Sequence, residues 1–306
     1  MITASHNPVQ DNGIKMVDPD GGMLEQAWEA HACSVANADE AGVMAALEAV
    51  AAAEGIAMPI AGAQVYVARD TRPSSGELSA LVVAGATAMG AAVTDHNLLS
   101  TPQLHHLVRM VNLGGDAQAQ WGSEEGYYKM LAAAYKDILQ GVDANPAGRG
   151  KVVFDGAGGV GAPKLELLQP FMKDLLDMEV RNGVGAPGLE LNEGVGAEHV
   201  QKSRTPPVVG FSADADRSLR LASVDGDADR LVYHYFDAEG AWHLLDGDAI
   251  AALAASFIAD NFRALGMTIT DGTPASGGAG GSPLGEVSVG VVQTAYANGA
   301  SSAYIR

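Results

Sequence analysis

Hydrophobic and polar positions along the chain predict strands that are followed by helices. Short apolar runs rich in β-branched residues, typical of buried strands, occur at residues 63–68, 151–155 and 231–236, and residues 178–181 are a further candidate strand. Apolar residues at helical spacing occur at residues 78–89, from Pro163 onward, and at residues 249–262. Strands that alternate with helices predict an α/β protein with mixed, mainly parallel sheets.

Breaks in this pattern divide the chain into three expected domains, at residues 1–146, 147–246 and 247–306. Residues 143–150, which contain Asn-Pro and two glycines, predict a linker between the first two domains. A further strand is expected at residues 287–293. Because the chain ends soon after it, we expect the third domain to be partial.

The composition of the chain limits the classes of molecule that we expect it to bind. With 47% hydrophobic residues among 306, the chain can bury ordinary cores, but its formal net charge of −19 argues against nucleic acid and anionic membrane as partners. A phosphorylated small molecule stays compatible, because it responds to a local field. The chain has one cysteine, Cys33, which excludes an intramolecular disulfide and is expected to be a small core residue. The sequence shows neither a secretory signal nor an uninterrupted membrane span, so we expect a cytoplasmic protein; its oligomeric state is left open.

The most specific motif is a run of alternating aspartates, Asp225, Asp227 and Asp229, between two apolar segments. Three hard carboxylate ligands favour Mg²⁺ or Ca²⁺ over a soft metal. An EF-hand is excluded, because its sixth position requires glycine and is Arg230 here. A solvated acidic loop is the simpler alternative, but the apolar flanks favour a metal site in a tight turn. The similar stretch at residues 212–217 lacks the third acid and predicts a surface loop.

A second candidate site is the glycine-rich stretch after the strand at 151–155. Gly156-x-Gly158-x-x-Gly161 has the form of a dinucleotide-binding fingerprint, which would make the protein an NAD-dependent oxidoreductase. The acidic residue that should hold the ribose is missing from the end of the next strand, which runs into Asn182. With 38 glycines in the chain, a close strand-to-helix turn is the better interpretation.

The chain opens on a third candidate, a rigid polar loop that contains Ser5 and His6. Neighbouring side chains of an extended segment point to opposite sides, so the two do not form a serine-hydrolase pair. Taken alone, this loop predicts a surface turn. A serine that carries a phosphoryl group, however, requires a divalent cation and nearby positive charge, and together with the aspartate motif this chain offers both.

Thr3-Ala-Ser-His-Asn-Pro8 and Asp225-Gly-Asp-Ala-Asp-Arg230, in this order, resemble the phosphoserine loop and the metal loop of the α-D-phosphohexomutases. Other segments resemble the members of this family that act on N-acetylglucosamine phosphates. These segments are residues 11–15, 23–31, 69–75, 101–105, 125–128 and 291–299. The resemblance thus extends over nearly the whole chain, and it implies α/β/α domains of the phosphohexomutase type.

The resemblance also implies an activity: interconversion of N-acetylglucosamine 6-phosphate and 1-phosphate, a step toward UDP-N-acetylglucosamine. Ser5, as phosphoserine, would transfer its phosphoryl group to the sugar through a bisphosphate intermediate. Mg²⁺ would be held by Ser5 with Asp225, Asp227 and Asp229. His6 and Lys15 match acid–base positions near the sugar hydroxyl, and Arg230 and Lys15 would offset excess negative charge.

The resemblance further implies that a strand and helix precede the serine loop and that a sugar-selecting loop and a C-terminal phosphate-binding domain follow. Residues 1–306 do not contain these parts, so we expect a chain that is truncated at both ends. On that expectation the serine loop has lost its supporting strand and lies on a mobile terminus. We then expect little or no mutase turnover from this chain alone, and a non-catalytic remnant of the mutase is the alternative.

Overall fold

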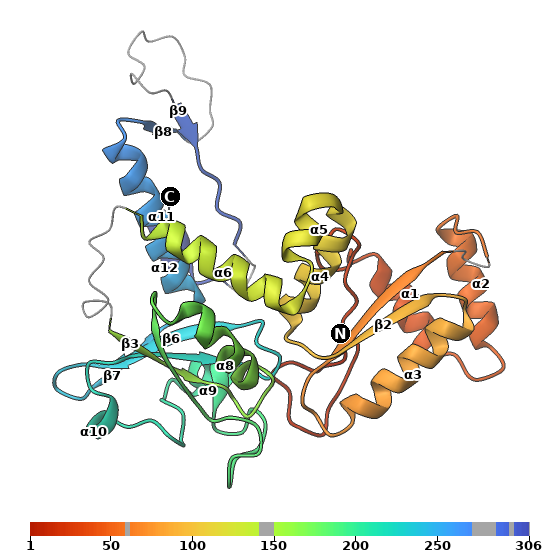
Figure 1. The fold of residues 1–306 in the computed structure, drawn as a ribbon, viewed down its shortest axis with the longest axis horizontal. Coiled ribbons are helices and arrows are strands. Elements are labelled where there is room, and N and C mark those ends of the chain that lie inside the picture. The colour runs from red at the N-terminus through yellow and green to blue at the C-terminus, as the bar shows by residue number, and fades with distance from the viewer. Residues whose placement is uncertain (59–61, 141–149, 271–285, 294–296, 306) are drawn as a thin grey trace.

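The computed structural model describes residues 1–58, 62–140, 150–270, 286–293 and 297–305, and its strands form three separate sheets (Figure 1). The first sheet pairs β1 (Gln64–Arg69) with β2 (Ala92–Leu98). The second has the order β4-β3-β5-β6-β7, with β3 (Lys151–Asp155), β4 (Asp177–Arg181), β5 (Arg220–Val224), β6 (Leu231–Phe236) and β7 (Trp242–Leu245). The third pairs β8 (Thr268–Thr270) with β9 (Glu286–Ser288).

Helices accompany each sheet (Figure 1). Those of the first unit (residues 1–140) are α1 (Trp28–Ala36), α2 (Val43–Ala53), α3 (Ser75–Ala88), α4 (Thr101–Leu113), α5 (Gly115–Trp121) and α6 (Glu124–Ile138). Those of the second unit (residues 150–245) are α8 (Gly161–Met172), α9 (Gly196–Ser203) and α10 (Ala213–Asp216). The third unit contains α11 (Gly247–Ala264) and α12 (Gly299–Ile305). No helix in the described part of the chain is both long and apolar enough to cross a bilayer.

The expectation of mixed, mainly parallel sheets is confirmed. β1 pairs with β2, β3 with both β4 and β5, and β8 with β9 in parallel, whereas β5, β6 and β7 pair antiparallel. The strands at residues 151–155 and 231–236 belong to one sheet, as expected. β3 and β5 are buried along almost their whole length, which explains the apolar residues 152–154 of β3 and 221–222 of β5.

The predicted elements differ from the observed ones mainly at their ends. The helix expected from Pro163 begins at Gly161, so the proline lies in the first turn. The strand expected at residues 287–293 is shorter, since β9 ends at Ser288. Most of the expected linker lies outside the described residues, and the domain boundaries remain a prediction.

Two expectations about individual segments are wrong. Cys33 is exposed on α1 rather than buried. Residues 212–217 are not a simple surface loop: Ser212 caps the short helix α10, and the buried Asp216 accepts a hydrogen bond from Arg181 at 2.8 Å. This acidic stretch therefore has a structural role in holding β4 to the polypeptide before β5.

The expectation that the serine loop lacks support is also wrong. Ile2 is buried, bridges to Arg69 at the end of β1, and exchanges backbone hydrogen bonds with Ala68 and Asp70 at 2.8 and 3.0 Å. Met1 belongs to the same apolar cluster as Leu99 and Leu104. The residues immediately before Ser5 thus extend the first sheet by one bridge and fix the loop to its edge.

A buried histidine in the second sheet gives a prediction of pH dependence. His234 on β6 contacts Ser223 Oγ through Nε2 at 3.1 Å and accepts a hydrogen bond from Trp242 on Nδ1. Burial lowers the pKa of His234 to about 4, so the unfolded chain binds more protons between that value and an ordinary pKa of about 6.5. We expect the free energy of unfolding to fall by on the order of 3 kcal/mol, from this group alone, as the pH falls through that range. The check is urea unfolding at several pH values on wild type and His234→Gln; equal pH dependence in both proteins would contradict the assignment.

Candidate active site

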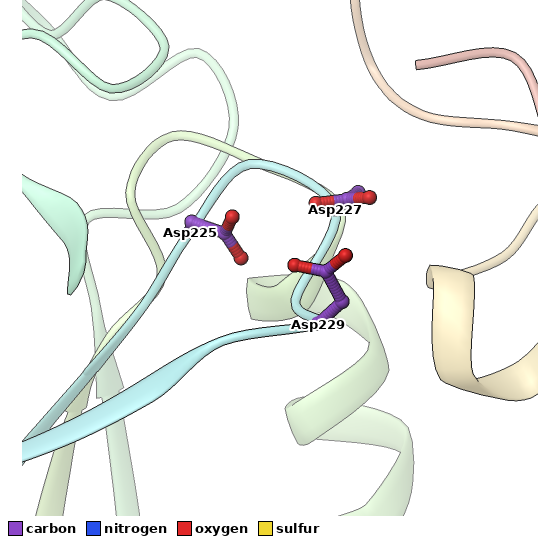
Figure 2. A group of neighbouring side chains, drawn as sticks. All are labelled: Asp225, Asp227 and Asp229. Atoms are coloured by element: carbon purple, nitrogen blue, oxygen red, sulfur yellow. The ribbon is translucent and has the colours of Figure 1, made fainter. Parts of the chain in front are cut away.

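The three aspartates converge at the turn between β5 and β6, where their carboxylates face a common space (Figure 2). The turn closes with a hydrogen bond from the Ala228 amide to the Asp225 carbonyl, and Ala228 takes a left-handed conformation with φ 57°. One oxygen from each carboxylate lies within 4.8 Å of the others. Asp225 and Asp227 are fully buried, while Asp229 faces solvent.

The carboxylate oxygens at this turn that accept no hydrogen bond could bind a divalent cation. Asp225 Oδ2 and Asp227 Oδ1 are buried and have no hydrogen-bond partner among the described residues. Burial, together with the charges of Asp227 and Asp229, raises the pKa of Asp225 to about 7. Buried carboxylate oxygens without partners are costly. A hard cation that prefers oxygen ligands would compensate that cost, so the donor set suits Mg²⁺.

Ser5 lies directly beside this turn, as the paired motifs predicted. Its Oγ is 3.2 Å from Asp227 Oδ2, although the two residues are 222 positions apart. Thr101, at the start of α4, also donates to Asp227 Oδ2 at 2.6 Å, and its amide donates to the Asp227 carbonyl. The first unit therefore brings two hydroxyl groups to one carboxylate of the second.

Two of the predicted cationic residues are arranged around the aspartates. Lys15 Nζ lies 2.7 Å from Asp227 Oδ2 and 2.6 Å from Asp229 Oδ2. Burial alone would lower the pKa of Lys15, but hydrogen bonds to these two carboxylates and their charges outweigh burial and raise it. Arg230 is held mainly by Glu198, which its Nη1 binds at 2.6 Å, and its Nε is 3.9 Å from Asp225 Oδ2. Lys15 thus directly neutralises the site, while Arg230 does so at a distance.

His6 shares Glu198 with Arg230. Its Nε2 is 3.8 Å from Glu198 Oε1, and its Nδ1 is buried without a partner among the described residues. Burial, and next the positive charge of Arg230, lower the pKa of His6, so the ring is neutral at pH 7 and can accept a proton. His6 and Lys15 consequently lie at the same site, where His6 is neutral and Lys15 is protonated.

The dinucleotide interpretation of Gly156-x-Gly158-x-x-Gly161 is not favoured by the structure. The backbone amides that a pyrophosphate would use, from Gly156 to Val160, all donate to groups of the protein itself. A Cβ at Gly159 would lie 2.4 Å from the Gly226 carbonyl oxygen, and one at Gly161 would lie 2.8 Å from Val224. These glycines allow the strand-to-helix turn to pack against the aspartate turn.

Several residues that contact the site were not singled out as site residues from the sequence. Thr101 and Arg72 lie in segments that carried the family resemblance, so a signal was present. Asn192 and Glu198 lie in irregular and helical segments without any motif.

The aspartate turn supports a direct prediction about metal binding. We expect calorimetry to detect Mg²⁺ binding to the wild-type chain and Asp227→Asn to weaken it by at least about 10- to 100-fold, the loss typical even for outer partners of metal ligands. Asp237→Asn, which removes a carboxylate that pairs with His243 elsewhere, is the matched control and should bind Mg²⁺ normally. Tight Zn²⁺ binding with no Mg²⁺ binding by the wild type would contradict the prediction.

Comparison with known proteins agrees with this geometry. Residues 1–42 and 34–119 match the family phosphoglucomutase/phosphomannomutase, alpha/beta/alpha domain I, and residues 246–306 match phosphoacetylglucosamine mutase AMG1, domain III. The whole chain is 39% identical to the phosphoacetylglucosamine mutase of Sus scrofa and 40% identical to that of Arabidopsis thaliana, covering 52% and 53% of these proteins. The crystal structure of N-acetylphosphoglucosamine mutase from Aspergillus fumigatus in complex with GlcNAc-6P and magnesium superimposes with a TM-score of 0.80 at 38% identity, over 100% of this chain and 53% of that one.

In residues 1–119 the chain thus resembles the phosphoglucomutase/phosphomannomutase family, whose model matches there. Along its whole length it is similar in sequence and fold to phosphoacetylglucosamine mutases. It spans about half the length of the curated relatives that it matches.

Proposed function

We propose that this chain carries the phosphoserine and the metal site of a phosphoacetylglucosamine mutase, which interconverts N-acetylglucosamine 6-phosphate and N-acetylglucosamine 1-phosphate. The observation that supports this most is the 3.2 Å approach of Ser5 Oγ to Asp227, beside carboxylate oxygens that have no other partner. The names of the relatives, and the GlcNAc-6P and magnesium in the Aspergillus fumigatus structure, support the substrate class. The product would lead toward UDP-N-acetylglucosamine in the cytoplasm.

In this proposal Asp225, Asp227 and Asp229, with an oxygen of phosphorylated Ser5, hold Mg²⁺. The bound ion would offset negative charge on the transferring phosphoryl group. Lys15 remains protonated and acts as a fixed positive charge beside Asp227 and Asp229. Arg230 adds a second positive charge, held by Glu198.

The phosphoryl transfer itself follows from these positions. The bond between phosphorus and Ser5 Oγ breaks, and Oγ takes up a proton to become a hydroxyl again. A bond forms from phosphorus to a hydroxyl oxygen of the sugar phosphate, which becomes a bisphosphate. The hydroxyl proton passes to a base, and the neutral ring of His6 fits that task better than the protonated amine of Lys15. Return of the other phosphoryl group to Ser5 completes the exchange.

The experiment is incubation of the purified chain with a hexose 1,6-bisphosphate and Mg²⁺. Intact-mass measurement should show the gain of one phosphoryl group, and peptide mapping should place it on Ser5. A coupled assay with N-acetylglucosamine 6-phosphate then asks whether the chain alone completes turnover, which separates a working mutase from a chain that is only phosphorylated. Incorporation at another residue, or none, would contradict the proposal.

A further inference from the structure

The backbone of the serine loop is held from two directions at the same two atoms. The carbonyl oxygen of Ser5 accepts hydrogen bonds from Arg72 Nη2 at 2.9 Å and from Asn192 Nδ2 at 2.8 Å. The carbonyl oxygen of Asn7 accepts from the same two donors at 2.9 and 3.2 Å. Arg72 belongs to the first unit and Asn192 to the second, so the loop is clamped between them.

The Arg72 side of this clamp is rigid. The buried guanidinium also donates to the carbonyls of Pro8 and Asp11 and pairs with Asp70 at 3.0 Å. Asp70 in turn accepts a hydrogen bond from Thr3 Oγ1 at 2.7 Å, and Thr3 Oγ1 accepts one from the Ser5 amide at 2.9 Å. The first unit thus fixes both the amide and the carbonyl of Ser5.

The Asn192 side connects the serine loop to the turn that carries Asp225, Asp227 and Asp229, which we call the metal turn. The backbone of Asn192 is left-handed, with φ 61°, and its backbone N–H donates to the carbonyl oxygen of Ala157. Ala157 lies in the glycine turn that packs against Gly226. Its Oδ1 is buried and finds no partner among the described residues. The side chain keeps this orientation despite an unpaired acceptor, which identifies the two hydrogen bonds to the serine loop as the interactions that fix it.

Ser5 requires such a clamp because of its own conformation. It is left-handed, with φ 49°, which a residue with a side chain rarely adopts. Its carbonyl oxygen also lies only 2.6 Å from where a Cβ on Gly226 would be, so the loop closes on the metal turn without spare room. A small displacement of the carbonyl would move Oγ away from Asp227.

We infer that Asn192 is a positioning residue for Ser5: its amide group couples the serine loop of the first unit to the metal turn of the second and sets the distance between Oγ and Asp227. This inference rests on the proposed function for the chemistry that Ser5 performs. Asn192 itself contacts only backbone carbonyls of the serine loop, so it acts through Ser5 and not on the substrate.

The experiment compares Asn192→Gly and Asn192→Asp with wild type. Glycine tolerates the left-handed backbone but removes the donor, and aspartate keeps the shape but turns the donor into a carboxylate that repels the two carbonyl oxygens. Asn112→Ala is the control, because Asn112 is exposed and bonds only within its own helix. The readouts are hydrogen exchange of a peptide covering residues 3–13, Mg²⁺ affinity, and single-turnover phosphorylation of Ser5 from a hexose 1,6-bisphosphate.

We expect both Asn192 variants to lose exchange protection in residues 3–13. Phosphorylation at saturation should slow by about 10- to 100-fold, as misplacement of a reacting group does, and the aspartate variant should be the slower. The half-saturating bisphosphate concentration and the Mg²⁺ affinity should stay within about 2-fold of wild type, which a general structural defect would not spare.

Unchanged protection and unchanged rate in both variants would overturn the inference. If wild type takes up no phosphoryl group, the proposed function fails, but the exchange measurement still decides whether Asn192 holds the loop. Urea unfolding followed by tryptophan fluorescence in a Trp28→Phe, Trp121→Phe background, in which Trp242 is the one tryptophan left, shows whether each variant keeps the second unit folded. If Asn192→Gly does not fold, the isosteric Asn192→Asp decides the outcome.

Discussion

Ser5→Ala is expected to abolish phosphoryl-enzyme formation while leaving the fold and the metal site in place. The hydroxyl is the group that would accept the phosphoryl group, so no other change in this chain removes the chemistry as completely. The fold should survive because the loop is held through backbone atoms of Ser5, by Thr3, Arg72 and Asn192. Asp227 also keeps its hydrogen bonds from Lys15 and Thr101 when Oγ is removed.

The measurement is intact mass after incubation with a hexose 1,6-bisphosphate and Mg²⁺. Ser5→Ala should gain no phosphoryl group, and calorimetry should show that it still binds Mg²⁺. Ser79→Ala is a matched control, since Ser79 is a buried serine on α3 whose hydroxyl has no hydrogen-bond partner among the described residues. Phosphorylation of Ser5→Ala to the wild-type extent would show that the acceptor is another residue.

Arg72→Met is expected to give the largest loss of stability in the first unit, about 3–5 kcal/mol. The change leaves the fully buried carboxylate of Asp70 without its cation and removes a donor from each of four loop carbonyls. Breaking one side of a buried ion pair is costly because the remaining charge stays out of water. Arg72→Lys should recover only part of the loss, since one ammonium cannot replace a planar guanidinium that serves four carbonyls and a carboxylate.

Urea unfolding followed by tryptophan fluorescence measures this effect in a Trp242→Phe background, in which Trp28 and Trp121 of the first unit are the tryptophans left. Arg263→Met is the control, because Arg263 forms an exposed pair with Asp260 within one helix and should change stability little. A loss for Arg72→Met no larger than that of the control would contradict the assignment of Arg72 as a buried clamp.

Part of the second sheet could be predicted from the sequence because burial leaves a pattern there: β3 is buried along almost its whole length, and β6 alternates between buried and more exposed positions. The apolar runs at residues 151–155 and 231–236 match β3 and β6 at both ends. β2 and β7 were not predicted, because their residues are mostly exposed or half-buried and leave no clear apolar pattern. The buried strand β5 was not predicted as a strand either, and its apolar residues were interpreted only as a flank of the aspartate motif.

The residues of the candidate site likewise fall into those that the sequence indicates and those that it does not. Ser5 and the three aspartates stand out because their residue types and spacing have few other uses. Asn192 and Glu198 do not, since their contacts with the serine loop and with His6 come from the packing of one unit against another. The support of the serine loop was misjudged for a related reason: the residues that hold it, such as Asp70 and Arg72, come later in the chain than the loop itself.

The placement of Ser5 on one sheet unit and of the aspartates on another has a mechanical consequence. Neither core needs to deform for Oγ and Asp227 to separate; a rigid-body rotation between the two units is sufficient. Hydrogen bonds across this junction, from Thr101, Lys15 and Asn192, therefore stabilise one orientation of the first unit relative to the second. The rate of phosphoryl transfer to Ser5 would then depend on the fraction of time in which the two units are in contact. A ligand that binds between the units and separates them would inhibit phosphoryl transfer without binding to Ser5 or to the aspartates.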